Sequence, residues 1–407
     1  MNSTATAVVM DLLDSDSDDA GQAVASGSRQ RPASSSTNRR PALGGAPSNK
    51  KACLSSLAVM VAHSVTSAFG RELVQYGSDC SGLDGGAFAL RYNGTRFGHR
   101  FGSELNKSYR NVFAANHPDC GAVFGDITER DFQSFHQYAG VNVYTAGFPC
   151  QPFSPAGHGL GQRDSEGRGL VVWWVIMTIS IILPWAFILE NVASLATFRK
   201  HRPFFDAILA ELRRVDGGAY EVEWAILCSR RHGDSAAARE RVYIVGIRLD
   251  KKRKHWQWPA VTDPPQLDSV LERGLPCRDI STLTDTQLKH LEVGLQKIQR
   301  QRPGTNLTSE PWVIDINAGP NFATYTSYDH LPTITKSRGS SGFWVVKLDR
   351  FTTGTEHLRC QGFRPEDVVV PDGASMTSFN GMAGNAFTVS VFQRLWRQLL
   401  PAVGLAP

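Results

Sequence analysis

Short apolar runs separated by Gly-rich or polar turns recur along the chain from about residue 54 onward. Runs of this length, bounded by turn residues, are typical of buried strands. Strands are therefore expected at 73–78, 122–124, 141–144, 185–189, 222–227 and 242–247. Between them lie longer segments that predict helices, so the pattern indicates an α/β fold.

The stretch 169–189 carries no charged residue and is long enough to raise the question of a membrane span. Pro184 interrupts it, and a proline inside a helix costs roughly 3 kcal/mol. Thr178 and Ser180 also dilute its apolar character. The better interpretation is a buried helix over 171–182, a turn at Pro184 and a core strand over 185–189, with no membrane span.

A single cysteine, Cys150, lies between Pro149 and Gln151 directly after the strand expected at 141–144. A Gly-rich, polar segment follows over 155–169. A strand end that leads into a loop is where α/β folds present reactive groups, and Ser154 adds a polar group there. Taken alone, Cys150 is as readily a small buried apolar side chain, which is the usual role of a lone cysteine.

Three loops at successive strand ends carry residues suited to an adenosine-containing cofactor. The first is a glycine turn with Gly82, after which a helix begins; glycines let the backbone approach a ligand, and a helix start offers free N–H groups. Glu104 follows about twenty residues later, where an acid can bind ribose hydroxyls. Asp126 follows the third strand. The alternative is that these side chains are ordinary helix caps.

Two further groups are expected at the same edge of the sheet as Cys150. Glu190 ends the strand 185–189, where it could act in catalysis or cap the helix that follows. Arg239 and Arg241 precede the strand 242–247. Because strand side chains alternate between faces, both arginines should lie on one face.

Composition narrows the functional classes. The 407 residues are 42% hydrophobic and 10% aromatic, which suits a globular protein with a sizeable core. The formal charge of +5 and the pI of about 8.8 are compatible with a nucleic-acid partner without indicating one. Seven scattered cysteines contain no C-x-x-C pair, which favours a reducing compartment over a disulfide framework or a zinc site.

Residues 1–52 are predicted to be a disordered tail, since they contain few aromatic residues and many Ser, Ala, Gly and Pro. Residues 8–13, with an acidic flank, resemble a SUMO-interacting segment, so SUMO or chromatin proteins are candidate partners. Two basic pairs, Arg39-Arg40 and Lys50-Lys51, resemble a bipartite nuclear import signal and suggest a nuclear location. The alternative for the whole segment is a solvated tail.

A small second domain is expected over 251–335, where the pattern changes. It opens with the basic run Lys251–Lys254, which could contact phosphates, act as a nuclear signal or simply be solvated. A helix should begin at Thr284 with a capping box to Gln287. Its apolar face is expected to carry Leu288, Leu291, Leu295 and Ile298.

The last segment, 336–407, is expected to return to the first domain. The segment 381–387, which contains Asn385, is expected to open an apolar helix that continues through Leu395 and Leu399. An asparagine between small residues at a helix start is a good cap, and it is also well placed to line a pocket.

In this order, these pieces resemble the DNA cytosine-5 methyltransferase family from about Gln75 to Leu400. The segments that carry the resemblance are 147–151 (Gly-Phe-Pro-Cys-Gln), 190–192 (Glu-Asn-Val), 239–241 (Arg-Glu-Arg), 333–335 with 361–363, and 384–386 (Gly-Asn-Ala). The resemblance implies a Rossmann-like S-adenosylmethionine-dependent methyltransferase domain over 53–250. A small target-recognition domain would then occupy 251–335, within the variable stretch between Arg248 and Leu331, before the return over 336–407.

The resemblance also implies an activity, methylation of C5 of a flipped-out cytosine in DNA. Cys150 would attack C6 while Glu190 acts at N3, and Arg239 and Arg241 would hold the base and the catalytic loop. The cofactor would be bound by Gly82, Leu83, Glu104, Asp126, Ile127, Pro149 and Asn385. The DNA would be contacted by Gln151, Ser154 and Arg168, with 155–169 as a clamp, and no metal is expected.

This sequence departs from the family pattern at several positions. Cys80 stands where an aromatic residue is usual, Asp84 enlarges the glycine turn, and Leu105 replaces the aromatic that often follows the ribose-binding acid. Ala237 replaces a glutamine, and the loop 233–236 before it is altered. The catalytic loop is one residue longer before Arg168.

Three other functions remain as alternatives. The branch of the family that methylates tRNA usually carries a Cys-Phe-Thr motif, which is absent here. A non-catalytic adaptor would be expected to lose a catalytic residue, whereas Cys150, Glu190 and both arginines are present. A dehydrogenase-like dinucleotide enzyme would be stabilised by NAD rather than by S-adenosylmethionine.

Overall fold

The computed structural model describes residues 73–154 and 161–406. The predicted tail at 1–52, and with it the SUMO-interacting and nuclear-import segments, lies outside the described residues. Within the described part, no helix combines the length and apolar character needed to cross a bilayer. The six cysteines found there are free thiols.

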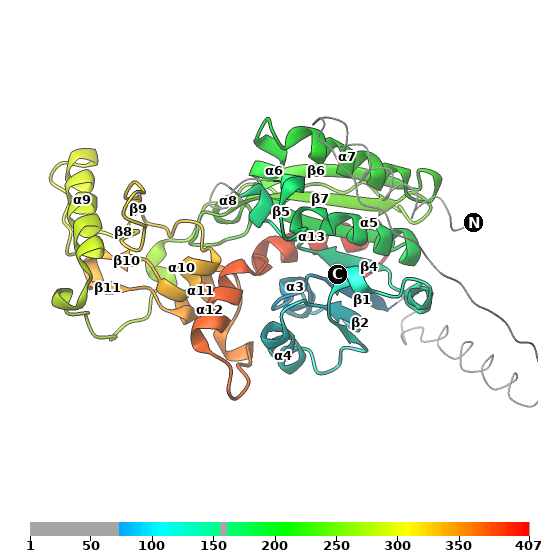
Figure 1. The fold of residues 1–407 in the computed structure, drawn as a ribbon, viewed down its shortest axis with the longest axis horizontal. Coiled ribbons are helices and arrows are strands. Elements are labelled where there is room, and N and C mark those ends of the chain that lie inside the picture. The colour runs from blue at the N-terminus through cyan, green and yellow to red at the C-terminus, as the bar shows by residue number, and fades with distance from the viewer. Residues whose placement is uncertain (1–72, 155–160, 407) are drawn as a thin grey trace, which may run out of the picture. The chain divides into compact units, whose positions relative to one another are not determined.

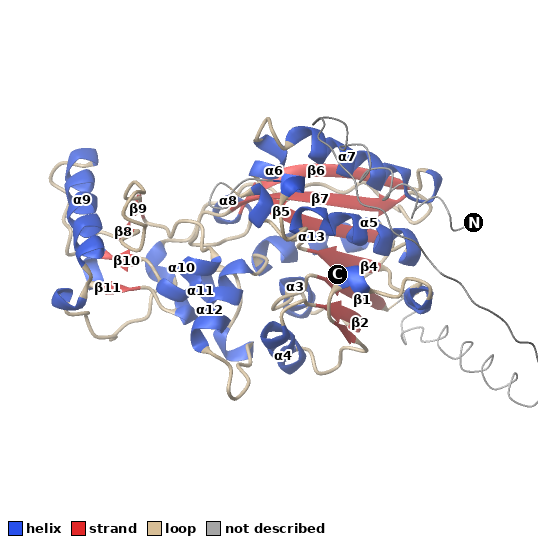
Figure 2. Ribbon diagram, viewed as in Figure 1, coloured by secondary structure: helices blue, strands red, loops and turns tan. Residues whose placement is uncertain are grey.

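A seven-stranded sheet forms the centre of the first domain (Figures 1 and 2). Its strands run in the order β3-β2-β1-β4-β5-β7-β6, and the first five are parallel. The strands are β1 (Val74–Asp79), β2 (Phe97–Ser103), β3 (Val123–Phe124), β4 (Val143–Ala146), β5 (Ala186–Val192), β6 (Tyr220–Cys228) and β7 (Glu240–Arg248).

Helices connect these strands and cover both faces of the sheet. They are α3 (Gly85–Tyr92), α4 (Lys107–Asn116), α5 (Val171–Ile182), α6 (Ser194–Thr197), α7 (Arg202–Arg214), α8 (Ser229–His232) and, far along the chain, α13 (Val389–Ala402). All six strands predicted from the sequence are present, and the helix expected over 171–182 has those bounds. The alternation confirms the predicted α/β, Rossmann-like class.

The core of this domain joins distant parts of the sequence. Ile188 belongs to the same buried cluster as Trp396 of α13, whereas Phe187 packs against Tyr220 on the opposite face of the sheet. Trp396 also donates its indole N–H to the carbonyl of Gly86 in α3 at 3.2 Å. Helix α13 therefore packs into the core of the large sheet.

Strand β7 is antiparallel to both of its neighbours, β5 and β6. Arg241 at its start pairs with Val192 at the end of β5. The carboxyl ends of the parallel strands and the amino end of β7 therefore meet at one edge of the sheet. Functional groups of α/β folds gather at this edge.

A second, four-stranded antiparallel sheet has the order β11-β10-β8-β9. Its strands are β8 (Trp312–Ile314), β9 (Thr326–Tyr328), β10 (Trp344–Val345) and β11 (Arg350–Phe351). Two of the four strands come from beyond residue 335, where the return to the first domain was expected to begin. The domain boundaries themselves stay predictions.

Four helices accompany this sheet and the return of the chain: α9 (Asp285–Gln301), α10 (Lys336–Ser341), α11 (Gly354–Cys360) and α12 (Met376–Asn385). The capping box between Thr284 and Gln287 at the start of α9 is confirmed. Leu291 and Ile298 are buried, but Leu288 is exposed, so its assignment to the apolar face was wrong. At 37% exposed, Leu288 lies outside the buried cluster that contains Leu291 and Ile298.

The prediction that Asn385 caps a helix was also wrong. Asn385 is the last residue of α12, and the next helix begins at Val389 with Thr388 as its N-cap. A Cβ on Gly384 would lie 2.5 Å from the carbonyl oxygen of Thr335, so the glycine is needed where α12 packs closely on the start of α10. Close packing, rather than a turn, explains the small residues of this segment.

Candidate active site

The loop that carries Cys150 is bonded to the strand that carries Glu190. Residues Ala146 and Leu189 are paired in neighbouring parallel strands, so Cys150 and Glu190 follow at the same edge of the sheet. The side chain of Asn191 donates from Nδ2 to the carbonyl of Phe148 at 3.0 Å. The nucleophile candidate and the acid candidate are thereby held by one hydrogen-bonded unit.

Glu190 lies between two arginines. Its Oε1 is 3.2 Å from Nε of Arg241 and 3.8 Å from Nη2 of Arg239. The residue is 7% exposed, and Oε1 accepts no hydrogen bond from any group in the described part of the chain. Ala193 heads the following helix without a side-chain cap, so helix capping does not explain this carboxylate. A buried carboxylate oxygen without a donor indicates a site built for a ligand.

The two arginines have different partners. Arg239 donates to the backbone carbonyls of Ile334 at 2.9 Å, Gly384 at 3.1 Å and Ala386 at 3.2 Å. Those carbonyls belong to the segment before α10 and to the end of α12, not to the catalytic loop that Arg239 was expected to hold. Arg241 donates to its neighbour's carbonyl and otherwise faces Glu190. Arg241 is therefore the arginine whose guanidinium is directed at the acid.

Cys150 is half-buried at the start of a short 3-10 turn. Burial raises the pKa of its thiol, Arg241 and Arg239 lower it, and Glu190 raises it. Burial has the largest effect, so the pKa of Cys150 lies above its usual value and the thiol is protonated at neutral pH. Any attack by this sulfur requires that the proton leave in the substrate complex.

The predicted cofactor residues of the first three loops are adjacent. The amide of Gly82 donates to Oε2 of Glu104 at 3.1 Å, and Glu104 continues β2 next to Phe124, two residues before Asp126. Gly82 has φ +53, and the position of a Cβ there is open space. Leu83 and Ile127 are buried beside them, and Pro149 precedes Cys150 at the same edge. This open backbone edge with two carboxylates fits a nucleoside with hydroxyl and amino donors.

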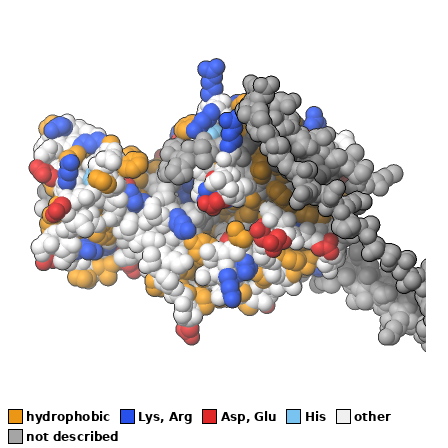
Figure 3. Space-filling model, in the orientation of Figure 1, with side chains coloured by type: hydrophobic (Ala, Val, Ile, Leu, Met, Phe, Trp, Pro, Cys, Tyr) orange, Lys and Arg blue, Asp and Glu red, His pale blue; other side chains and the backbone are white. Residues whose placement is uncertain are grey.

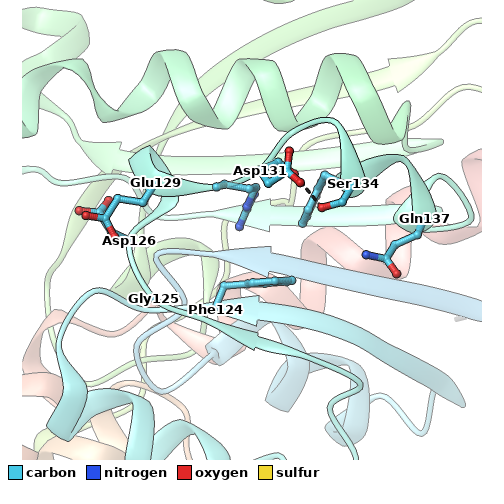
Figure 4. A pocket seen from close by; sticks show the side chains of 9 residues that line it. Phe124, Gly125, Asp126, Glu129, Asp131, Ser134 and Gln137 are labelled. Atoms are coloured by element: carbon cyan, nitrogen blue, oxygen red, sulfur yellow. Dashed lines mark hydrogen bonds between the residues drawn. The ribbon is translucent and has the colours of Figure 1, made fainter. Parts of the chain in front are cut away.

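A cavity of about 260 Å³ adjoins this region, with Phe124, Asp126, Arg130 and Gln137 in its wall. Figure 4 shows Asp126 and Glu129 at one end of it and Gln137 at the other. Oδ1 of Asp126 accepts from both the amide and the hydroxyl of Thr128 at 2.8 Å, so this acid also caps the turn that follows it. Both interpretations of Asp126, cap and cofactor ligand, are compatible with its position.

Arg130, which was not predicted from the sequence, lies in the wall of this cavity and links several elements at this edge of the sheet. Its guanidinium forms a buried ion pair with Asp79 at the end of β1 and donates to Thr178 of α5 at 2.7 Å. Tyr144 and Ser103 also donate to Asp79, at 2.7 and 2.6 Å. These partners come from four elements far apart in sequence, so no local pattern could have indicated the cluster.

The three residues expected to contact DNA lie on either side of residues 155–160, which are outside the described part of the chain. Gln151 is exposed and Ser154 is half-buried. Arg168 donates to both carboxylate oxygens of Asp164, at 2.9 and 2.7 Å, and lies 3.2 Å from Glu166. The cation expected to meet a phosphate is thus already paired within its own loop.

The basic run Lys251–Lys254 follows the end of β7, at the sheet edge opposite Arg241. Seven residues of strand separate Arg241 from Arg248, which corresponds to roughly 20 Å. Lys252 pairs with Glu221 at 2.5 Å, and Lys251 lies over the ring of Trp185 at 4.7 Å. Figure 3 shows the basic side chains of one face dispersed among acidic and apolar ones. These contacts favour the solvated, structural alternative for this run.

The residues around Ala237 that depart from the family pattern make buried contacts with the segment near Leu331 and with Cys360. Ala237 is buried and forms an isolated parallel bridge with Leu331. Ser235 donates from Oγ to the carbonyl of Cys360 at 2.5 Å, and its Oγ accepts from the amide of Ala237 at 3.0 Å. The altered loop therefore holds the segment that leads to 333–335 through this bridge, and Ala237 itself is 2% exposed.

In the described part of the chain, no three or more His, Cys, Asp or Glu side chains converge in an arrangement that could hold a metal ion. Asn385 is exposed, and its carbonyl accepts weakly from Arg239 at 3.4 Å. The predicted residues that the structure brings together are thus Cys150, Glu190, Arg239 and Arg241 in one group and Gly82, Leu83, Glu104 and Asp126 in another.

Two bacterial methyltransferases are similar in sequence to this chain. Type II methyltransferase M.NgoBI of Neisseria gonorrhoeae is 30% identical over 299 residues, which is 72% of this chain and 83% of the relative. Type II methyltransferase M.HaeII of Haemophilus aegyptius is 28% identical over 308 residues, covering 75% and 87%.

Solved structures share the fold at low sequence identity. The S. pombe Dnmt2 methyltransferase superposes with a TM-score of 0.53 at 16% identity, over 81% of this chain and 99% of that one. The Entamoeba histolytica methyltransferase EhMeth gives 0.56 at 15% identity, over 81% and 99%. The model of the family described as C-5 cytosine-specific DNA methylase matches residues 77–400. The chain therefore belongs to the C-5 cytosine-specific DNA methylase family.

Proposed function

We propose that this protein methylates C5 of a flipped-out cytosine in double-stranded DNA through a covalent bond between Cys150 and C6 of the base. The observation that carries the proposal is the buried Oε1 of Glu190. It lacks a hydrogen-bond donor, lies beside two arginines and belongs to the strand bonded to the Cys150 loop. A hydrogen-bond donor of a base, such as a protonated ring nitrogen, is the group that would complete this site.

S-adenosylmethionine, the cofactor of this family, supplies the methyl group when bound. Glu104 and Asp126 would accept hydrogen bonds from its ribose hydroxyls and its adenine amino group. The backbone at Gly82 and Leu83, with Ile127, Pro149 and Asn385, would form the rest of its site. The open space at Gly82 leaves room for this approach.

The chain's own residues account for the activation of the base. Cys150 gives up its thiol proton to solvent, and its sulfur bonds C6, so the electron pair of the C5–C6 double bond moves to C5. Glu190 donates a proton or a hydrogen bond to N3 and offsets the charge that develops on the ring, while Arg241 would hold O2. After C5 is methylated, its proton leaves, the C5–C6 double bond re-forms and the sulfur departs.

The target base must leave the helix, because a stacked cytosine cannot be reached by Cys150. Extrusion costs a few kcal/mol. Gln151, Ser154 and Arg168 would contact the DNA around the extruded nucleotide. For Arg168, a phosphate would replace Asp164 as its partner.

Trapping on 5-fluorocytosine tests the mechanism, because the missing C5 proton prevents release of the enzyme. Duplex DNA and tRNA that contain the analogue would be offered in parallel with S-adenosylmethionine, and a denaturant-stable adduct would be measured. We expect an adduct on DNA with the native chain and no adduct with Cys150→Ala.

Each other outcome has a definite meaning. An adduct on tRNA alone would replace DNA by tRNA as the substrate. An adduct that persists in Cys150→Ala would overturn the role of Cys150. Absence of any adduct across a randomised-sequence DNA library, with cofactor binding intact, would favour the non-catalytic adaptor.

A further inference from the structure

A buried histidine lies directly beneath the glycine turn. His117 follows α4, is 2% exposed, and has both ring nitrogens in contact with protein atoms. Nδ1 is 2.8 Å from Nη2 of Arg91, and Nε2 is 3.1 Å from the carbonyl oxygen of Leu83. Leu83 is one of the backbone positions assigned above to the cofactor site.

The partners of His117 fix its protonation. A guanidinium can only donate, so Nδ1 must accept from Arg91, and the ring proton must lie on Nε2. That N–H then donates to the carbonyl of Leu83. Burial, with His99 and Arg91 nearby, lowers the pKa of His117 to about 3, which agrees with a neutral ring.

The ring orientation is fixed by packing as well. Its centroid lies 4.7 Å from the ring of Phe113, 5.4 Å from Phe88 and 5.2 Å from His99. Because the ring is enclosed on these sides, its Nε2–H is aimed at Leu83 and not at solvent.

The rest of the turn is held from other directions. Asp84 has φ +55, and its carboxylate accepts from the hydroxyls of Tyr76 at 2.6 Å and Ser78 at 2.7 Å and from the amide of Ala87 at 3.1 Å. Glu104 holds the amide of Gly82. The carbonyl of Leu83, between these two points, is held by His117.

We propose that His117 is a positioning residue for the cofactor: through the carbonyl of Leu83 it sets the backbone of the turn over 82–84. This inference rests on the proposed function, because it takes Leu83 as part of the cofactor site. Loss of the Nε2–H leaves the carbonyl without its donor and lets the turn move. The chemistry at Cys150, on a different loop, is unaffected.

The test compares His117→Leu with His117→Gln. Glutamine can place an amide N–H toward Leu83 and its carbonyl toward Arg91, whereas leucine can do neither. Dissociation constants for S-adenosylmethionine and for a DNA duplex would be measured by calorimetry, with KM and kcat for methyl transfer. For His117→Leu we expect S-adenosylmethionine to bind about tenfold more weakly, with KM raised and kcat unchanged. We expect His117→Gln to restore binding to within about threefold of the native chain.

Arg91→Met supplies a second route in case His117→Leu does not fold. It removes the group that holds the proton on Nε2, so it should also weaken cofactor binding, and its effect should be non-additive with that of His117→Gln. Unchanged affinity for S-adenosylmethionine in both His117→Leu and Arg91→Met would overturn the proposal. A fall in kcat as large as the rise in KM would overturn it as well. A native chain that binds no S-adenosylmethionine would instead overturn the proposed function on which the inference rests.

Discussion

Asn191 donates a hydrogen bond from its side chain to the carbonyl of Phe148, at 3.0 Å, and so joins the strand of Glu190 to the loop of Cys150. The same side chain accepts from the amide of Val192 at 2.8 Å, which fixes its orientation. Both contacts are buried. Beyond the pairing of β4 with β5, the separation of acid and nucleophile is therefore held by this one amide group.

Removal of that amide should misplace the nucleophile. For Asn191→Ala we expect the single-turnover rate of methyl transfer to fall by about 10- to 100-fold, since an error of 1 Å in position can cost that much. Affinity for S-adenosylmethionine should stay unchanged. Asn142→Ala is the matched control, because Asn142 bonds the backbone of Gln75 and Leu73 at the opposite ends of the strands. An equal fall in rate for the control would show a general loss of structure.

The charge of Glu190 affects the thiol of Cys150. Replacing Glu190 should therefore change the rate of thiol alkylation and the rate of methyl transfer in opposite directions. The carboxylate raises the pKa of Cys150, so Glu190→Gln should lower that pKa and speed alkylation of the thiol by iodoacetamide at pH 7. The same variant should slow methyl transfer by about 100-fold or more, because the group at N3 is lost.

Arg241→Met should change the pKa of the Cys150 thiol in the opposite direction, raising it. Arg241 lowers the pKa of Cys150, so its removal should slow alkylation and displace the pH profile of alkylation toward higher pH. Arg168→Met, which removes a cation paired with Asp164, serves as the control. Profiles that move in the same direction for Glu190→Gln and Arg241→Met would contradict the arrangement of charges described here.

Arg239 is expected to contribute to stability more than to the chemistry. Arg239→Lys keeps the charge but cannot reach the carbonyls of Ile334, Gly384 and Ala386 together. We expect the free energy of unfolding to fall by about 1–3 kcal/mol or more, measured by urea denaturation. Arg241→Lys, two residues further along the chain, should leave the unfolding midpoint in urea nearly unchanged. A larger loss for Arg241→Lys would reverse this assignment of roles.

Close packing between α10 and α12 can be tested with one methyl group. A Cβ on Gly384 would lie 2.5 Å from the oxygen of Thr335, so Gly384→Ala should lower the free energy of unfolding by roughly 1–3 kcal/mol. Gly140→Ala is the control, because a Cβ there meets nothing within 4 Å and φ lies outside the left-handed region. Equal stability of the two variants would show that the helices separate at little cost.

Local patterns predicted the framework of the first domain because its strands are short, apolar and bounded by turns. The strand ends at Cys150 and Glu190 followed directly from these patterns. The capping box at Thr284 was predictable for the same reason, since both of its groups lie within one helical turn. The parallel order of the strands then placed the two residues at one edge.

Features that depend on distant contacts were not predictable from the sequence. The carbonyl partners of Arg239 lie 95 to 147 residues away, and Arg130 meets Asp79 across 51 residues. The glycine at 384 was interpreted as part of a helix start, although it is required by the oxygen of Thr335 on another helix. Leu288 was predicted to be on the buried face of α9 because it fits the apolar period of the helix. The period alone does not show how far along the helix the core that covers this face extends.

The core cluster that joins Val74 to Leu405 has a consequence for synthesis. The strands β1 to β7 emerge from the ribosome before α13, whose side chains cover them. A nascent chain that already holds Cys150 and Glu190 therefore cannot close its hydrophobic interior. We expect catalytic competence to appear only after α13 has emerged, and early termination before α13 to yield an exposed sheet that chaperones and proteases recognise.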